Sequence, residues 1–506
     1  MPENNKGVSL WSLSLSKGRN HKRDFLFVIT FLKISSILLA LVGALFAVPV
    51  LVALGCHEPD MILPFVIPMA ASFVLCAVVN FFTRKTKVSM SIRQTFVIVA
   101  MSWVVMSVMG SVPLALSGYF NNYADALFES VSGFTTTGAT ILSEVENLPR
   151  SINMLRCLTH WIGGMGIVTL TVALLPLLGV GGFQLIKAET TGPEKGKVTA
   201  RITTTAKVLW GIYTGFTVAE TIALKLAGMD WIDAVSHAFA TLGTGGFSTK
   251  NASIGTYNSL AVEIIITVFM FLAGINFSLF VYIFQGKAKD IFGNAEFKAY
   301  LGILLVALVG ITISVIPYYG NFGTSLRYSS FQAVSIMTTT GFGTADYLQW
   351  PVIAQFFLFM LFFVGGCSGS TSGGIKVVRW VVLAKQLNNE TKRMLHPHGI
   401  FTIRLNGKVS SKDIVLSVTS FMFLYFVVIA ITFFVGCLGK LDVLSSVTGA
   451  LSMVGNVGPA FGLLGPTSNY GALPVFVKLW YCFAMLAGRL ELYTMVIFFM
   501  PSYWKK

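Results

Sequence analysis

Ten long apolar segments, separated by short polar connections, run through this 506-residue chain. Each has roughly 20 or more residues, which is enough to cross a bilayer hydrocarbon core of about 30 Å as a helix. Only 11% of the residues are charged, whereas soluble proteins carry about 25%. The chain is therefore an integral membrane protein. We expect its helical spans at residues 25–54, 61–82, 94–117, 153–179, 207–228, 258–285, 299–317, 350–383, 413–438 and 473–500.

Lysine and arginine gather in alternate connections between these segments. The N-terminal tail is basic, the chain ends in Lys505 and Lys506, and eight basic residues lie between Lys376 and Lys412. Because cytoplasmic loops carry such an excess, both termini are predicted to be cytoplasmic. The net charge of +15 then reflects membrane topology, and we expect no nucleic-acid partner.

Four shorter apolar segments lie between paired spans, at residues 124–136, 231–243, 327–339 and 443–455. At roughly 10–14 residues they are too short to cross a bilayer, so they fit re-entrant half-helices that enter from the external side. Acidic residues near their beginnings are expected to cap them or to draw cations towards the mouth of a pathway. These residues include Asp125, Glu129 and Asp233.

A stretch of threonine and glycine follows each half-helix. Non-helical backbone at membrane depth is tolerated only where it is buried or lines a watery path, and glycine permits the required conformations. Backbone carbonyls in such a loop replace the hydration shell of an ion, and the carboxyl end of a half-helix favours a cation. We therefore predict a filter that holds a cation at backbone carbonyls only, with the last glycines of the four stretches equivalent. Its residues are Thr136, Thr137, Gly138, Gly243, Thr244, Gly245, Thr339, Thr340, Gly341, Asn456, Val457 and Gly458.

A run of ten small or polar residues interrupts the apolar segment at 350–383. Glycine costs a helix about 1 kcal/mol per position, so this run is predicted to form an unwound, mobile loop beneath the filter. The residues of this loop include Gly365, Gly366, Ser368, Gly369, Ser370, Thr371, Gly373 and Gly374.

Arg489 lies about midway through the last predicted span. A charge at that depth costs at least about 2.5–3.5 kcal/mol and is functional by default. Glu491 is two residues away and lies on a different helix face, so it is not expected to neutralise the arginine. We expect Arg489 to oppose cations in the pathway, whereas Lys478 is expected to reach the outer interface.

The four stretches resemble the filter loops of the Trk/Ktr/HKT superfamily of potassium transporters. They read SGFTTTGAT (132–140), TLGTGGFST (241–249), MTTTGFGT (337–344) and GNVGPAFG (455–462). The two leading spans make the chain most similar to the Trk-type membrane subunit, and the resemblance extends from about residue 25 to residue 504. The fourth stretch departs from the others, because Asn456 and Val457 stand where threonines are expected.

An all-α polytopic membrane protein is the fold that agrees with this resemblance. Two leading transmembrane helices precede four pseudo-repeats of helix, re-entrant half-helix, filter loop and helix around one central pore. The expected boundaries are 1–90 for the N-terminus and leading helices, then 91–190, 191–290, 291–400 and 401–506 for the four repeats.

Uptake of K⁺ across a bacterial cytoplasmic (inner) membrane is the function that the resemblance implies. The glycine-rich loop is then an intramembrane gate and Arg489 a pore arginine. In this superfamily a serine in place of the first-repeat glycine is associated with sodium permeation, so the four glycines favour K⁺. A sodium-permeable or sodium-coupled transporter is the alternative.

A polytopic membrane enzyme is a remote alternative, because no acids, histidines or cysteines stand at usable spacing for catalysis or for a covalently bound cofactor. The resemblance also implies two partners: a second copy of the chain in a homodimer, and a cytosolic nucleotide-binding regulatory ring protein.

Overall fold

The computed structural model describes residues 10–84, 86, 92–166, 202–284, 286, 289–406, 408–409 and 412–497. Three regions of the sequence predictions lie outside the described residues. They are the second part of the span at 153–179, the basic connection at 187–201 and the end of the chain from residue 498.

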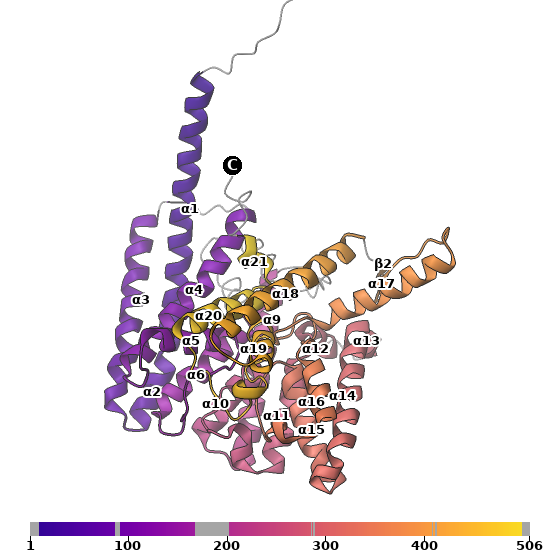
Figure 1. The fold of residues 1–506 in the computed structure, drawn as a ribbon. Coiled ribbons are helices and arrows are strands. Elements are labelled where there is room, and N and C mark those ends of the chain that lie inside the picture. Colours follow the sequence, from indigo (N-terminus) through magenta and orange to yellow (C-terminus); the bar gives the residue numbers. More distant parts are fainter. Residues whose placement is uncertain are drawn as a thin grey trace, which may run out of the picture.

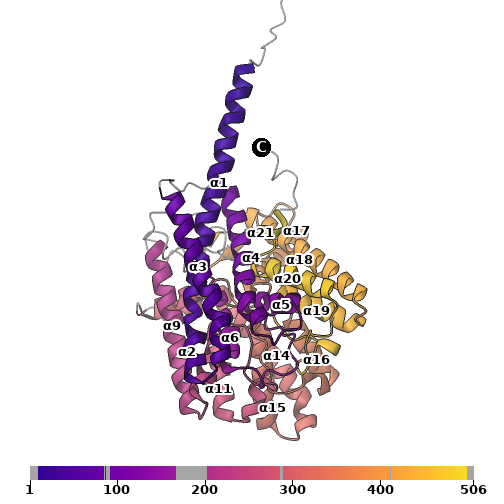
Figure 2. The same ribbon diagram turned by 90° about the vertical axis from the view of Figure 1, so that its left-hand side faces the viewer.

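The leading part of the chain is a helical hairpin. It consists of α1 (Leu10–Leu45), α2 (Ala47–Gly55), the short 3₁₀ helix η1 (Pro59–Met61) and α3 (Ile62–Thr83). Helices α1 and α3 pack side by side, and α1 extends well beyond the body of the protein (Figure 1). This hairpin covers one flank of the molecule, where α2 packs on α6 (Figure 2).

Each of the four repeats begins with a long helix that leads into a half-helix. The long helices are α4 (Ile92–Leu116), α9 (Ile202–Leu226), α14 (Ala295–Tyr319) and α18 (Lys412–Leu438). The half-helices are α5 (Tyr123–Phe134), α10 (Trp231–Leu242), α15 (Phe322–Met337) and α19 (Val443–Gly455). All four predicted half-helices are present. Helix α15 begins earlier than residue 327 because the side chain of Asn321 caps it by accepting a hydrogen bond from Gly323 N–H.

The caps of the first two half-helices differ from the prediction. Asn122 and Asp230 occupy the N-cap positions, one turn before Asp125 and Asp233. Asp125 is instead buried and pairs with Lys478, whose Nζ lies 2.6 Å from Asp125 Oδ1. The prediction that Lys478 reaches the outer interface is therefore wrong. Helix α20 packs on α5, so the ammonium group is enclosed and a buried carboxylate compensates its charge.

Helices that follow the half-helices are short or broken. They are α6 (Arg150–Gly164), α11 (Leu260–Ala273) with α12 (Phe277–Phe284), α16 (Val352–Leu361) with α17 (Val377–Leu395), and α20 (Val475–Arg489) with α21 (Tyr493–Val496). Helices α11 and α12 meet at an angle of 98°. Glycines at these ends allow close backbone approach. A Cβ built on Gly163 would lie 1.9 Å from Phe134 O, and one on Gly488 would lie 2.0 Å from Val454 O.

Within the described residues, five helices are long and apolar enough to cross a membrane, or six if the bent α11–α12 pair counts as one. The five are Leu26–Gly55, Pro59–Thr83, Phe96–Leu116, Ala295–Tyr319 and Ile414–Leu438. The break predicted within 350–383 is present, between α16 and α17. The spans predicted at 258–285 and 473–500 are also broken, between α11 and α12 and between α20 and α21. Hydropathy alone does not detect these last two breaks.

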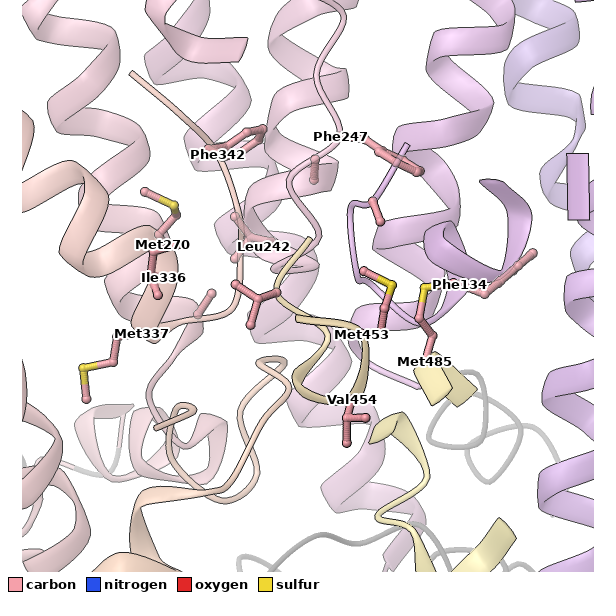
Figure 3. Close-up of a cluster of buried hydrophobic side chains, with 14 of the residues drawn as sticks. Phe134, Leu242, Phe247, Met270, Ile336, Met337, Phe342, Met453, Val454 and Met485 are labelled. Atoms are coloured by element: carbon pink, nitrogen blue, oxygen red, sulfur yellow. The ribbon is translucent and has the colours of Figure 1, made fainter. Parts of the chain in front are cut away.

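The remaining described elements are small. They are the 3₁₀ helices η3 (Ser253–Tyr257), η4 (Tyr347–Gln349) and η5 (Gly462–Leu464), helix α13 (Lys289–Gly293), and the antiparallel pair β1 (Arg404–Leu405) and β2 (Lys408–Val409). Half-helices and broken helices surround the centre of the molecule: α5 contacts α6 and α20, and α10 contacts α6 and α11. Apolar side chains near the ends of the half-helices, including Phe134, Leu242 and Met453, surround the loops that follow them (Figure 3).

Candidate functional site

The loops after the four half-helices repeat one backbone conformation. In the first three repeats the second residue beyond the half-helix has a left-handed backbone conformation, and in the fourth repeat the first residue has it. The φ angles are 54° at Thr136, 53° at Thr244, 55° at Thr339 and 55° at Asn456. Two residues later stands a glycine with positive φ in every repeat. These glycines are Gly138 (77°), Gly246 (78°), Gly341 (82°) and Gly458 (98°).

The residue between these two positions makes the same hydrogen bond in each repeat. Its N–H donates to the carbonyl oxygen five residues earlier, inside the half-helix. The four pairs are Thr137 to Ser132 at 2.9 Å, Gly245 to Ala240 at 2.8 Å, Thr340 to Ser335 at 2.9 Å and Val457 to Ser452 at 3.0 Å. Four stretches of different sequence are therefore held to their half-helices in the same way.

The four loops close into a ring. A Cβ built on each positive-φ glycine would collide with a carbonyl oxygen of the next repeat, and the fourth repeat returns to the first. The distances are 2.0 Å from Gly138 to Gly245 O, 2.0 Å from Gly246 to Thr340 O, 2.2 Å from Gly341 to Val457 O and 2.5 Å from Gly458 to Thr137 O. Glycine is required at these four positions for two reasons: φ is positive, and no space is left for a Cβ atom.

The alignment of the second repeat therefore needs a correction. The counterpart of Gly138 is Gly246, and the predicted Gly245 occupies the position of Thr137, Thr340 and Val457. Two consecutive glycines stand at this point of the sequence, and only the backbone conformation distinguishes them. Gly245 has a different reason to be glycine, because a Cβ there would lie 2.2 Å from the His160 ring.

A cavity of about 120 Å³ lies directly beside the ring, on the side that the sequence predicts to be external. All four repeats line it. Its walls include Gly138, Thr140, Gly246, Ser248, Gly341, Gly343, Gly458, Pro459 and Tyr470. The ring thus opens into a small vestibule that is formed largely by backbone and hydroxyl groups.

Residues 365–374 form a non-helical hairpin between α16 and α17, as the run of small residues predicts. Gly365 N–H donates to Ile375 O at 2.9 Å, and Val377 N–H donates to Gly366 O at 3.1 Å. Cys367 N–H donates to Gly274 O, at the break between α11 and α12. The loop is therefore fastened to the second repeat as well as to itself, and its mobility stays a prediction.

The glycine-rich loop touches the candidate filter directly. Gly373 N–H donates to Thr339 Oγ1 at 2.6 Å. A Cβ on Gly373 would lie 2.5 Å from Gly455 O, at the end of α19. Two of the four filter loops are thus in contact with the loop.

Glu296, which the sequence analysis did not single out, also holds the loop. Its side chain is 5% exposed, and Oε1 accepts hydrogen bonds from Ser368 N–H at 2.6 Å and from Val378 N–H at 3.1 Å. Val378 lies in the first turn of α17, where a carboxylate is stabilised by the unpaired N–H groups of the helix. The sequence could have indicated this role, because Glu296 is an acidic residue directly before the predicted span at 299–317.

Arg489 is the last residue of α20 and does not lie in the middle of a continuous helix. Its guanidinium donates to Thr371 O at 2.8 Å, to Gly163 O at 2.6 Å and to Gly164 O at 3.0 Å. The latter two carbonyls are at the carboxyl end of α6, where the helix dipole favours a cation. The arginine therefore joins the glycine-rich loop to the first repeat.

Two further cations near the loop were missed by the sequence analysis. Lys376 is buried, and its Nζ donates to Ser372 O. Arg379 pairs with Glu491 at 2.6 Å, and its guanidinium lies 3.7 Å from the centre of the Phe421 ring. Glu491 thus has a partner on α17, in agreement with the expectation from its helix position that it would not neutralise Arg489.

Within the described residues, no three histidine, cysteine, aspartate or glutamate side chains gather in a way that could hold a metal ion. His160 packs between the first two repeats: its Nδ1 lies 2.8 Å from Gly133 O, and its Nε2 accepts a hydrogen bond from Phe247 N–H at 3.2 Å. Backbone carbonyl oxygens are the polar groups that each repeat places against the positive-φ glycine of its neighbour.

Comparisons with known proteins give a consistent result. The family model TrkH, described as "Cation transport protein", matches residues 63–506. The Trk system potassium uptake protein TrkH of Halomonas elongata is 38% identical over 481 residues, covering 94% of this chain and 99% of that protein. The protein of the same name from Escherichia coli K12 is 38% identical over 430 residues, covering 84% of this chain and 88% of that protein. The crystal structure of the potassium transporter TrkH from Vibrio parahaemolyticus superposes with a TM-score of 0.83 at 34% identity, covering 94% of this chain and 100% of that chain.

Proposed function

Because this chain belongs to the TrkH family of cation transport proteins, we propose that it carries K⁺ across the bacterial cytoplasmic membrane through the ring formed by its four filter loops. The ring of backbone carbonyls is the observation that carries this proposal. A carbonyl oxygen from each repeat lies against a glycine of the neighbouring repeat, so the four loops hold one another in place.

Carbonyl oxygens can replace the water around a dehydrated cation. Four half-helices also direct their carboxyl ends towards the ring, and each end carries partial negative charge. Both effects favour a cation over an anion. A positive-φ glycine stands in all four repeats, which favours K⁺ over the sodium-permeable alternative.

The site residues follow from this geometry with one change of register. The filter comprises Thr136, Thr137 and Gly138 and their counterparts in repeats three and four, whereas repeat two contributes Thr244, Gly245 and Gly246. The chain divides into leading helices (1–90) and four repeats (91–190, 191–290, 291–400 and 401–506).

A gate formed by the glycine-rich loop and Arg489 completes the pathway. Arg489 holds Thr371 O of the loop, and Gly373 N–H holds Thr339 of the filter, so the loop is tied at both places. Opening would require these hydrogen bonds to break, together with those that join the loop to Gly274 and Glu296.

The signal for opening would come from a cytosolic nucleotide-binding ring protein. Helix α17 begins at Val377, directly after the loop, and projects away from the body (Figure 1). It carries Lys385, Lys392 and Arg393, and Leu387, Met394 and Leu395 on it are 70%, 83% and 72% exposed. A partner that binds this helix would move the loop directly. The functional unit in this proposal is a homodimer in which each chain has its own pore and both termini are cytoplasmic.

Flux into liposomes tests the function. Purified protein should move K⁺ and Rb⁺ into vesicles much faster than Na⁺, and added nucleotide should act only when the ring protein is present. Equal rates for K⁺ and Na⁺ would support the sodium-permeable alternative. Full nucleotide control of the purified chain alone would contradict the partner proposal.

A further inference from the structure

A buried ion pair lies beside the first filter loop. Glu129 on α5 and Arg156 on α6 are 2.8 Å apart, Oε1 to Nε, and their side chains are 0% and 2% exposed. Arg156 also donates to Asn153 Oδ1 at 2.9 Å, and its guanidinium lies 4.3 Å from the centre of the Phe247 ring. Both side chains are almost wholly buried, and Arg156 also forms part of the wall of the vestibule.

The carboxylate of this pair binds the backbone and side chains just beyond the filter glycine. Thr140 Oγ1 lies 2.9 Å from Glu129 Oε1 and 3.1 Å from Oε2, and Ile141 N–H donates to Oε2 at 3.0 Å. Both donors come within three residues of Gly138. Glu129 therefore connects the half-helix to the outer part of the first filter loop.

Equivalent positions in the second and third repeats make comparable connections with neutral side chains. Seven residues before Thr244 stands His237, whose Nε2 lies 2.9 Å from Ser248 Oγ. Seven residues before Thr339 stands Gln332, whose Nε2 donates to Ala345 O at 3.2 Å.

The fourth repeat has Gly449 at this position, without a side chain to make the connection. Thr448, the neighbouring residue on α19, makes the connection instead, because its Oγ1 accepts a hydrogen bond from Phe461 N–H at 3.1 Å. Tyr347 of the third repeat adds a second contact, since its OH donates to Ala460 O at 2.7 Å. A brace between the half-helix region and the outer filter segment thus exists in every repeat, and a glutamate–arginine pair forms it only in the first.

We propose that Glu129 is a specificity-determining positioning residue: paired with Arg156, it fixes the outer part of the first filter loop and so helps set the preference of the ring for K⁺ over Na⁺. This inference rests on the proposed function. Charge-assisted hydrogen bonds are roughly twice as strong as neutral ones, so a neutral side chain holds Thr140 and Ile141 less firmly. A smaller ion can be coordinated only if the carbonyls move inwards, and a firmly held loop resists that movement.

Glu129→Gln tests the proposal, because the amide has nearly the same shape but no charge. The variant should lower the ratio of K⁺ to Na⁺ uptake by roughly tenfold, equivalent to about 1.4 kcal/mol. The matched control is Glu263→Gln. Glu263 on α11 pairs with Arg327 on half-helix α15 at 2.7 Å and is 4% exposed, and no hydrogen bond joins its carboxylate to a filter loop within the described residues. Its substitution should leave the ion preference unchanged.

Thr140→Val is a second variant that leaves the buried ion pair intact. It removes the hydroxyl that donates to Glu129 and accepts from Arg156 Nη2 at 3.3 Å, while Ile141 N–H still donates to Glu129. The ion preference should fall in the same direction, by a smaller factor. If Glu129→Gln is not recovered as folded protein, this variant decides alone. An unchanged ratio in the folded variants, or an equal loss in Glu263→Gln, would overturn the proposal. A parent protein that shows no preference for K⁺ would instead overturn the proposed function.

Discussion

The backbone N–H of Gly373 donates a 2.6 Å hydrogen bond to the hydroxyl oxygen of Thr339, and this bond joins the glycine-rich loop to the third filter loop. Thr339 is one of four residues at equivalent left-handed positions, and Gly373 lies near the end of the loop. Both residues are buried. A movement of the loop therefore cannot leave this part of the filter unaffected.

Thr339→Val should raise basal K⁺ flux in proteoliposomes that contain no partner protein. Valine keeps the shape of threonine but leaves the buried N–H of Gly373 without its acceptor, which costs about 1–3 kcal/mol and loosens the loop. Thr136→Val at the equivalent position is the comparison, because the Thr136 hydroxyl has no hydrogen-bond partner among the described residues. The K⁺ flux of Thr136→Val therefore shows the effect of losing a filter hydroxyl that makes no bond to the loop. An equal rise in both variants would show that the loop connection is not the cause.

Arg489→Ala should raise K⁺ flux without changing the preference among K⁺, Rb⁺ and Na⁺. A unit charge opposes a cation 4 Å away by about 4 kcal/mol at an effective dielectric constant near 20. That corresponds to roughly a thousandfold in occupancy, and the variant also frees Thr371 O from its guanidinium partner. Shortening the loop between Gly365 and Gly374 should raise the flux further. A change of ion preference without a rise in flux would mean that this region belongs to the filter.

Gly246→Ala should reduce K⁺ preference, as should Gly138→Ser. At φ near 78° a side chain is strained, and the added Cβ at Gly246 would lie 2.0 Å from Thr340 O. The carbonyl would have to turn away from its place in the ring. Gly302→Ala is the control, because a Cβ at Gly302, on α14, meets no heavy atom within 4 Å. Competition of K⁺ uptake by Na⁺ measures the effect, and full retention of preference in Gly246→Ala would remove this glycine from the filter.

Lys478→Met should destabilise the protein, because it leaves the carboxylate of Asp125 buried without its cation. Removing one partner of a buried pair typically costs about 3–5 kcal/mol. The double variant Asp125→Asn with Lys478→Met should recover much of the loss, since no unpaired charge then remains. Thermal unfolding in detergent is the measurement. A single variant as stable as the parent would indicate that water reaches Asp125 in solution.

Local patterns in the sequence were sufficient for the half-helices and for the unwound loop. Helix α19 occupies residues 443–455 as predicted, because an apolar segment bounded by Asp442 and by glycine and asparagine specifies a short helix on its own. The ten small or polar residues from Gly365 to Gly374 cannot sustain a helix in any context. The family could also be recognised, since the four filter stretches are contiguous in sequence.

Contacts between distant residues decided what the sequence left open. Gly245 and Gly246 cannot be told apart until the ring of His160 is placed against the first and the carbonyl of Thr340 against the second. Both of these residues are distant from the two glycines in the sequence. The partner of Asp125 is Lys478, 353 residues along the chain, and the guanidinium of Arg489 meets Gly163, 326 residues before it. The sequence by itself determined four re-entrant units of one kind, because helix length, glycine content and capping act over a few residues. Only the closure of the four units into a ring determined the register of the second filter loop, the ends of α6 and α20 and the buried ion pairs, because each depends on backbone and charges that another repeat supplies.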